Sequence, residues 1–174
     1  MIRGTRINLR TVGPADLPML DAWAADPEFA SEYNFFGLVP PNAYTQRMAG
    51  DGMLSERHGT LLVVLPDGTP VGDVSFRDVM YGPGSGSRAY NIGIALAPEH
   101  RGQGYGSEAQ QLLAAYLLAT YPIMRIEAST DITNTPEQRA LEKAGFQREG
   151  VLRKAQWRNG GWHDLVVYSK LRGE

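Results

Sequence analysis

Apolar and polar residues alternate along several short stretches of the chain, as they do in strands that are buried on one face. Such alternation, or a compact apolar run, predicts strands at residues 7–12, 60–65, 70–80, 88–96, 124–129, 146–156 and 161–171. Tight turns are expected at Pro66-Asp67-Gly68-Thr69 and at Arg158-Asn159-Gly160, because these residue types favour chain reversals. The pattern therefore predicts a central sheet of about seven strands.

Helical spacing of apolar residues is clearest after the strand at residues 88–96. There Ala109, Leu112, Leu113, Tyr116 and Leu117 fall at i, i+3, i+4, i+7 and i+8, on one face of a helix. Further helices are predicted at residues 14–26, 42–56 and 134–143, and Pro27 is expected to end the first of them.

Residues 28–41 contain four aromatic side chains without a clear period. We expect a loop there, either packed by its own aromatics or forming a wall of an acceptor pocket. The strand–helix–strand order at residues 88–129 favours a parallel pair joined by a right-handed crossover. The prediction is one mixed α/β (α+β) domain over residues 1–174, with about four helices around the sheet.

The net charge of −2 and the pI near 5.9 give no electrostatic reason to expect nucleic acid or an anionic membrane as a partner. The chain has no cysteine, which excludes disulfides, thiolate metal sites and a cysteine nucleophile. Its three histidines lack metal-ligand spacing, so no metal is expected. Without a signal peptide or a membrane-length apolar run in the sequence, we expect a cytoplasmic protein.

A glycine-rich turn, Arg101-Gly102-Gln103-Gly104-Tyr105-Gly106, connects the strand at residues 88–96 to the long helix. A helix N-terminus exposes unpaired N–H groups and positive partial charge, and glycines let an anion approach the backbone. A pyrophosphate is therefore a suitable ligand. The turn lacks the Lys-Ser or Lys-Thr of a P-loop and the glycine spacing of a dinucleotide fingerprint. What remains is Arg-x-x-Gly-x-Gly, with a tight connection that binds nothing as the alternative.

This motif resembles the acetyl-CoA-binding motif of the GNAT superfamily of N-acetyltransferases. A second motif strengthens the resemblance, because NTPEQRALEKAGF at residues 134–146, followed by Glu149-Gly150, is similar to a run in the Rim-type (RimJ/RimL) branch of ribosomal-protein N-terminal acetyltransferases. Leu9-Arg10 and Trp162-His163-Asp164 are similar to that branch as well. The resemblance covers essentially the whole chain, in the family's order.

The resemblance implies a sheet that splays between the strand ending near Leu96 and the strand ending near Thr130, with acetyl-CoA in the opening. Backbone groups of Leu96 would bind the pantetheine and polarise the thioester carbonyl. Asn134 would contact the pantetheine arm, and Lys143 is a candidate for a CoA phosphate. The pyrophosphate would be held by the residues of the turn and the first helical turn, namely Arg101, Gly102, Gln103, Gly104, Tyr105, Gly106 and Ser107.

Two of these residues also have a purely structural interpretation. Asn134 and Glu137 have the spacing of a helix N-cap and its N3 partner, and the cap and the cofactor contact are compatible. Lys143 also suits a solvated charge in the last turn of a helix, where the helix dipole favours a cation.

The chain departs from the family pattern where protons are transferred. Leu141 stands where other members have a tyrosine acid, Gln156 where the branch has a carboxylate, and Asn91 where many relatives have glutamate. Glu137 is therefore our first candidate for proton transfer. The alternatives are a water relay to Asp73 or Glu127, and an acid role for Tyr90 or Tyr168.

The sequence thus predicts an acetyl-CoA-dependent N-acetyltransferase that acts by direct attack of a primary amine, on a protein N-terminus or on a small molecule. Two alternatives stay open: another acyl donor such as succinyl-CoA on the same fold, and an acyl-CoA sensor without turnover. The resemblance also makes a homodimer through the C-terminal strands one option.

Overall fold

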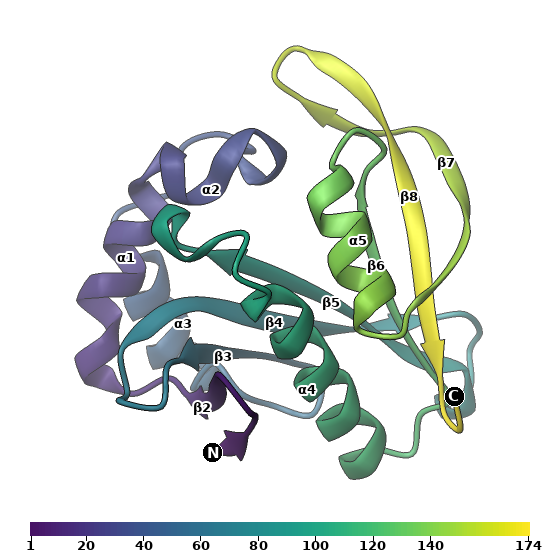
Figure 1. Ribbon diagram of the computed structural model, residues 1–174, viewed down its shortest axis with the longest axis horizontal. Helices are drawn as coiled ribbons and strands as arrows, with labels where there is room; N and C mark the ends of the chain where they lie inside the picture. The colour runs from purple at the N-terminus through teal and green to yellow at the C-terminus, as the bar shows by residue number, and fades with distance from the viewer.

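A computed structural model describes the backbone of residues 1–174 and every side chain except that of Asp51. One eight-stranded sheet runs through it, in the order β1-β2-β3-β4-β5-β6-β8-β7 (Figure 1). The strands are Ile2–Arg3 (β1), Asn8–Thr11 (β2), His58–Val64 (β3), Pro70–Met80 (β4), Arg88–Leu96 (β5), Arg125–Asp131 (β6), Gln147–Arg158 (β7) and Gly161–Leu171 (β8). Neighbouring strands are antiparallel except for β5 and β6.

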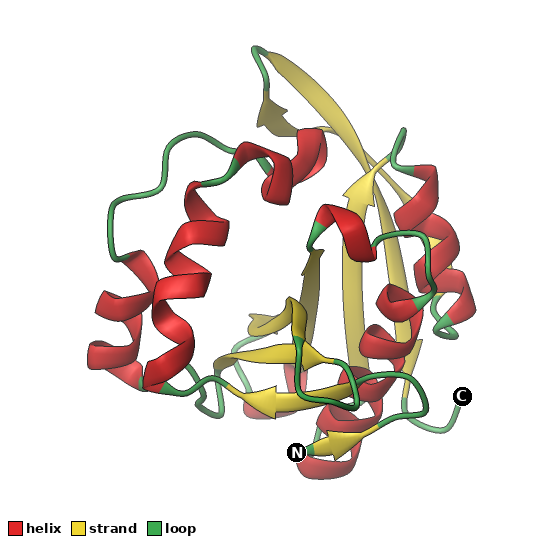
Figure 2. Ribbon diagram, turned by 60° about the vertical axis from the view of Figure 1, so that its left-hand side comes forward, coloured by secondary structure: helices red, strands yellow, loops and turns green.

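Helices cover both faces of this sheet (Figures 1 and 2). They are Leu17–Ala25 (α1), Pro27–Asn34 (α2), Ala43–Asp51 (α3), Tyr105–Thr120 (α4) and Thr135–Lys143 (α5). Within the described chain, no helix combines the length and the apolar character needed to cross a membrane.

Strand β3 explains why helices pack on both faces. Its consecutive apolar residues divide between two cores, because successive side chains of a strand point to opposite faces. Leu61 and Val63 join the core under α4 and α5, whereas Leu62 and Val64 join the core shared with α1 and α3. A strand with such a continuous apolar run must be covered on both sides.

The parallel pair of strands separates soon after it forms. Only Tyr90–Ile126 and Asn91–Glu127 are in register between β5 and β6, with α4 as the crossover. Beyond these pairs the carboxyl-terminal halves of both strands diverge. The predicted splay between the strands that end near Leu96 and Thr130 is confirmed.

The numbers of elements and one boundary differ from the prediction. The sheet has eight strands because the short β1 pairs with β2, and there are five α-helices because α2 occupies part of the expected loop at residues 28–41. Pro27 is the first residue of α2, where its missing N–H leaves no bond unmade, and Asp26 caps the helix by accepting from the Glu28 N–H at 2.9 Å. A left-handed Ser31, with φ 61°, interrupts α2, which accounts for the missing period.

The β7–β8 hairpin projects beyond the rest of the sheet (Figure 1). It turns through Asn159 and Gly160, whose φ values of 49° and 76° suit a two-residue reversal, so the predicted hairpin is confirmed. Beside the turn, the Arg158 Nη2 lies 2.5 Å from the Asp131 Oδ2 at the end of β6, and the two side chains are only 3% and 1% exposed. The Arg158 Nη1 also donates to the Tyr33 carbonyl at 3.1 Å, so this buried pair ties the hairpin to α2.

Candidate active site

The N-terminus of α4 offers an uninterrupted series of backbone donors at the opening of the sheet. Among the hydrogen bonds of the described residues, none uses the N–H groups of residues 102–107. Gly104 is the N-cap of α4 and has no side chain that accepts from the first turn. Together with the positive end of a 16-residue helix, these donors suit an anion. Pyrophosphate binding by these groups stays a prediction, and this geometry supports it.

The shape of the turn depends on two left-handed glycines and on Arg6. Gly102 and Gly104 have φ values of +73° and +81°. A Cβ on Gly104 would lie 2.9 Å from the Arg6 Nη1, whereas a Cβ on Gly102 would meet open space. The guanidinium of Arg6 donates to the carbonyls of Gln103 at 2.9 Å and Gly104 at 3.2 Å, and its Nε donates to the Glu108 Oε2 at 3.0 Å. Sequence reasoning missed Arg6, because its partners lie about a hundred residues away.

Arg101 holds α2 against the turn. Its Nε donates to the Leu96 carbonyl at 2.9 Å, and its Nη2 donates to the carbonyls of Glu28 at 2.9 Å and Phe29 at 2.7 Å. Three of its five N–H donors are thus taken by main-chain carbonyls. The guanidinium therefore has a structural task in this conformation, beside the phosphate contact that the sequence suggests.

Other side chains of the turn are also engaged with the protein. The Gln103 amide donates to the Glu99 carbonyl at 2.9 Å, and the Tyr105 ring centre lies 5.9 Å from the Arg6 guanidinium carbon. A Cβ on Gly106 would make ordinary contact with the Leu96 side chain at 3.6 Å. These contacts leave the main-chain N–H groups as the principal donors for an anion.

Leu96 ends β5 at the point where the sheet opens. The next N–H along the chain, that of Ala97, donates to the carbonyl of Val71 in β4 at 2.9 Å. Because successive N–H groups of a strand point to opposite edges, the Leu96 N–H points away from β4, toward the gap that the divergence of β6 leaves. This is the orientation that polarisation of a thioester carbonyl requires.

A cavity of about 1020 Å³ runs along α4 beside the turn. Its lining includes Gly102 and Ser107 together with three cationic residues, Arg3, Arg6 and Lys143. Lys143 is exposed at the end of α5, so it shares this cavity with the turn while keeping contact with solvent. Positive charge around the donor groups would favour a ligand with several phosphates.

Asn134 and Glu137 lie where α5 begins, beside the end of β6. The Asn134 Oδ1 accepts from the Glu137 N–H at 3.3 Å, and its Nδ2 donates to the Thr130 Oγ1 at 2.9 Å, so the predicted N-cap is confirmed. The Asn134 N–H already donates to the Asp131 carbonyl at 2.9 Å. The carboxyl of Glu137 is therefore free of the reciprocal capping bond.

The Glu137 carboxyl faces the buried Gln110 of α4. Burial raises the pKa of Glu137 to about 7, and the Gln110 amide opposes this shift. Gln110 is 1% exposed, and its Nε2 is one of two buried polar atoms among the described side chains that lack a hydrogen-bond partner. The Gln110 amide and the Glu137 carboxyl thus lie close to each other without a well-formed hydrogen bond, and a carboxyl that titrates near neutrality is a candidate for proton transfer.

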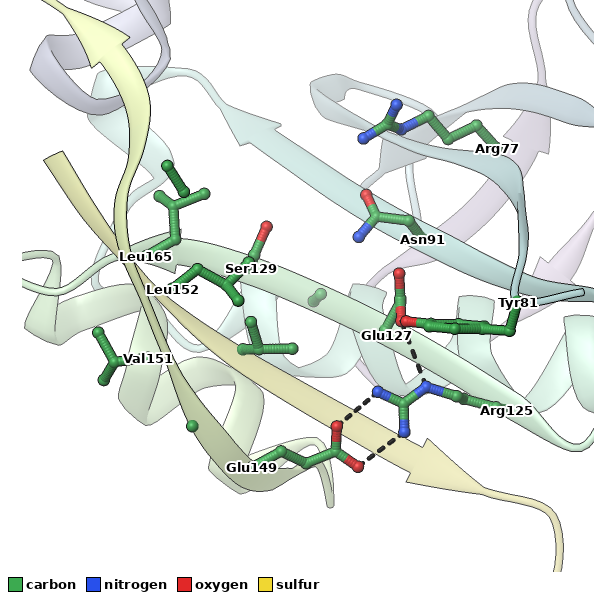
Figure 3. Close-up of a pocket in the computed structure, with 14 residues that line it drawn as sticks. Arg77, Tyr81, Asn91, Arg125, Glu127, Ser129, Glu149, Val151, Leu152 and Leu165 are labelled. Atoms are coloured by element: carbon green, nitrogen blue, oxygen red, sulfur yellow. Dashed lines mark hydrogen bonds and ion pairs between the residues drawn. The ribbon is translucent and has the colours of Figure 1, made fainter. Parts of the chain in front are cut away.

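A second cavity, of about 830 Å³, lies on the opposite face of the sheet (Figure 3). Its floor includes Asn91 and Glu127, the last residues in register before β5 and β6 diverge, and Ser129 beyond them. The neighbouring β6 residue Ile126 belongs to the core under α4, so Glu127 and Ser129, one and three positions further along the strand, point to the opposite face. This second cavity therefore lies over the start of the gap between β5 and β6, whereas the cavity along α4 is lined by the turn, by α4, by residues 3–6 and by Lys143.

Charged side chains at one end of this second cavity form a connected cluster. The Arg125 guanidinium donates to the Glu149 Oε1 at 2.7 Å and Oε2 at 2.5 Å, and its Nε donates to the Glu127 Oε2 at 3.2 Å. The Tyr81 hydroxyl donates to the same oxygen of Glu127. Hydrogen bonds from Arg125 and Ser169 lower the pKa of Glu149 to about 2, so this carboxylate is ionised at neutral pH.

The remaining proton-transfer candidates lie in different surroundings. Asp73 is 8% exposed on the face covered by α3, and burial raises its pKa to about 7, with Arg47 opposing the shift. The hydroxyl of Tyr90 donates to the Glu56 carbonyl at 2.6 Å, and that of Tyr168 donates to the Glu142 Oε1 at 3.1 Å. Both tyrosines are fully buried, so we favour structural roles for them.

Gln156, like the tyrosines, has a structural partner, since its Oε1 accepts from the Arg158 Nη1 at 2.7 Å. Among the described side chains, no group of three or more histidine, aspartate or glutamate residues is arranged to hold a metal ion.

A mixed sheet that splays between two parallel strands, with a glycine turn and a helix N-terminus at the opening, defines an acetyltransferase of the GNAT class. The family model described as an acetyltransferase (GNAT) domain matches residues 6–147, and the chain belongs to this family. The resemblance predicted from the sequence is therefore confirmed.

Individual proteins show the same likeness. The uncharacterized N-acetyltransferase YnaD of Bacillus subtilis (strain 168) is 26% identical over 152 residues, which cover 87% of this chain and 89% of that protein. The ribosomal L7/L12 alpha-N-protein acetyltransferase RimL, in complex with coenzyme A, has a TM-score of 0.82 at 20% identity, covering 98% of this chain and 97% of that one. Spermidine N-acetyltransferase from Vibrio cholerae, in complex with CoA and spermine, has a TM-score of 0.82 at 18% identity, covering 97% and 96%. These two structures share the fold of this chain.

Proposed function

We propose that this chain transfers the acetyl group of acetyl-CoA to a primary amine by direct attack in a ternary complex. The observation that carries the proposal is the series of unpaired N–H groups at residues 102–107, placed at the gap between β5 and β6. The donor would lie along α4 with its thioester in the gap, and the amine would enter from the cavity on the opposite face. Reactants held in this way gain most of their rate from proximity and preorganised electrostatics.

The chain's own groups can support each part of this transfer. The amine nitrogen attacks the thioester carbonyl carbon, the Leu96 N–H stabilises the oxyanion, and the C–S bond then breaks. The protonated carboxyl of Glu137 would give its proton to the departing thiolate, for which a pKa of about 7 is well matched. The proton lost by the amine would leave through water or through Asp73, whose pKa is also near 7.

The Glu137→Gln variant tests the proton step, because it keeps the shape of the side chain and removes the titrating group. Turnover, measured as thiol release, should fall about 10- to 100-fold on the true acceptor while the Kd for acetyl-CoA stays within about twofold. The exposed Glu32→Gln on α2 is the matched control and should change neither quantity. Unchanged turnover of Glu137→Gln would remove Glu137 from the mechanism.

The same assay separates the alternatives. Acetyl-CoA binding without thiol release across a broad panel of amines would favour a sensor, and faster release from succinyl-CoA than from acetyl-CoA would change the donor. The one-domain organisation, the cytoplasmic location, the homodimer and the absence of a nucleic-acid partner stay predictions from the sequence.

A further inference from the structure

The cavity on the acceptor face combines charged and apolar surfaces in separate places. Figure 3 shows the cluster of Arg125, Glu127 and Glu149 at one end, and Arg77 near Asn91 at another. The apolar part of the lining comes from β7 and β8 and consists of Val151, Leu152, Ala155, Leu165 and Val167. A ligand that fills the cavity would contact the Arg125 cluster, Arg77 and the apolar residues of β7 and β8.

The charges of this lining do not simply cancel. Arg125 is shared between Glu127 and Glu149, so the cluster keeps a net charge of −1. Arg77 is exposed, and no ion pair or hydrogen bond of its side chain is found among the described residues. The cavity therefore presents one excess negative charge and, separated from it, one unpaired positive charge.

We propose, on the basis of the proposed function, that the acceptor is a small α-amino acid with an apolar side chain. Arg77 binds its carboxylate, the Arg125 cluster attracts its ammonium group before deprotonation, and the apolar residues of β7 and β8 contact its side chain. Asn91 and Ser129, between these surfaces, supply polar groups beside the gap where the thioester would lie. Charge-assisted, planar binding of carboxylate is a role to which arginine is well suited.

The same lining disfavours two other acceptors. A polyamine carries at least two ammonium groups, but the lining has one excess negative charge, and Arg77 would repel the second ammonium group. A protein N-terminus has no carboxylate next to its amine, so it would leave Arg77 without a partner. The proposed acceptor of this chain therefore differs from spermidine, the acceptor named for the Vibrio cholerae enzyme.

The experiment compares three acceptors that share one hydrocarbon skeleton: L-leucine, L-leucinamide and 3-methylbutylamine. Thiol release is measured at saturating acetyl-CoA, and each kcat/KM is divided by the fraction of free amine at the assay pH. We expect L-leucine to exceed the other two by about 10- to 100-fold, which is the range of a charge-assisted hydrogen bond. Spermidine and a short peptide complete the panel.

Variants of Arg77 assign the preference to this side chain. Arg77→Met should raise the KM for L-leucine about 10- to 100-fold with little change in kcat, and should leave the KM for 3-methylbutylamine unchanged. Arg77→Lys keeps the charge and should recover part of the loss. Arg139→Met, at an exposed position of α5 outside the cavity lining, is the matched control and should behave as the wild type.

The outcomes distinguish the two levels of the proposal. Equal or better use of spermidine, the peptide or 3-methylbutylamine would overturn the amino-acid acceptor and leave the acetyltransferase intact. An equal effect of Arg77→Met on all acceptors would overturn the role of Arg77. Thiol release with no acceptor, although acetyl-CoA binds, would contradict the proposed function and this inference with it.

Discussion

Gly102 is the position at which the role of the glycine turn can be tested most directly. Its φ of +73° is left-handed, and a Cβ there would meet no protein atom within 4 Å. The residue lines the cavity along α4 and lies at the start of the unpaired N–H series. In Gly102→Ala, the added methyl group therefore strains the backbone and occupies space in which we expect the pyrophosphate, without disturbing the packing of the protein.

Two effects of the substitution can be estimated separately. An alanine in the left-handed region costs about 1–2 kcal/mol of stability. A hydrogen bond to a charged group is worth about 1.5–3 kcal/mol, so the loss of one N–H contact to a phosphate would weaken CoA binding about 10- to 100-fold. Gly68 provides the control, because its φ of +92° is also left-handed and a Cβ there also meets open space, but it lies in the turn between β3 and β4.

The measurements are chemical denaturation and titration calorimetry with CoA on the wild type, Gly102→Ala and Gly68→Ala. Both variants should lose similar stability, and only Gly102→Ala should lose CoA affinity. Equal CoA affinity of all three proteins would refute the assignment of the turn as the pyrophosphate site. Weaker binding by Gly68→Ala as well would show that backbone strain, rather than the site itself, controls affinity.

Two further predictions concern stability. Arg158→Met removes the guanidinium partner of the buried Asp131 carboxylate, which keeps its contacts with Thr133 and His163. It should lower the free energy of unfolding by about 3 kcal/mol, whereas the exposed Arg139→Met should change it by less than about 0.5 kcal/mol. A loss below about 1 kcal/mol for Arg158→Met would contradict the importance of the buried pair. Burial raises the pKa of Glu137 from 4.5 to about 7, so the folded protein binds a proton that the unfolded chain releases, and stability falls as the pH rises through this window. Glu137→Gln removes the titrating carboxyl. The free energy of unfolding of the variant, measured by urea titration, should therefore rise by about 1–3 kcal/mol relative to that of the wild type as the pH increases from about 5 to about 8. If the free energies of unfolding of the two proteins changed in parallel with pH, the raised pKa would be excluded.

Much of the local structure around the candidate donor site could be predicted from the sequence, because it depends on neighbours along the chain. The glycine turn before α4, the apolar face of α4 and the cap at Asn134 all follow from residue types at short spacing. Alternation and turn chemistry likewise gave the longer strands and the β7–β8 hairpin. The helix at residues 27–34 was missed because the left-handed Ser31 interrupts its period, and β1 because two residues carry no pattern.

Tertiary structure alone decided which distant side chains meet at the site. Arg6 lies against Gly104, Arg101 reaches the carbonyls of α2, and Arg158 is buried against Asp131 across 27 positions of the chain. The sequence also does not tell which arginines form ion pairs. Within one cavity, Arg125 is paired with Glu149, whereas Arg77 has no ion pair among the described residues. The physical reason is that periodicity and turn chemistry report interactions over a few residues, whereas charge pairing depends on strand order and on the face of the sheet to which each side chain points.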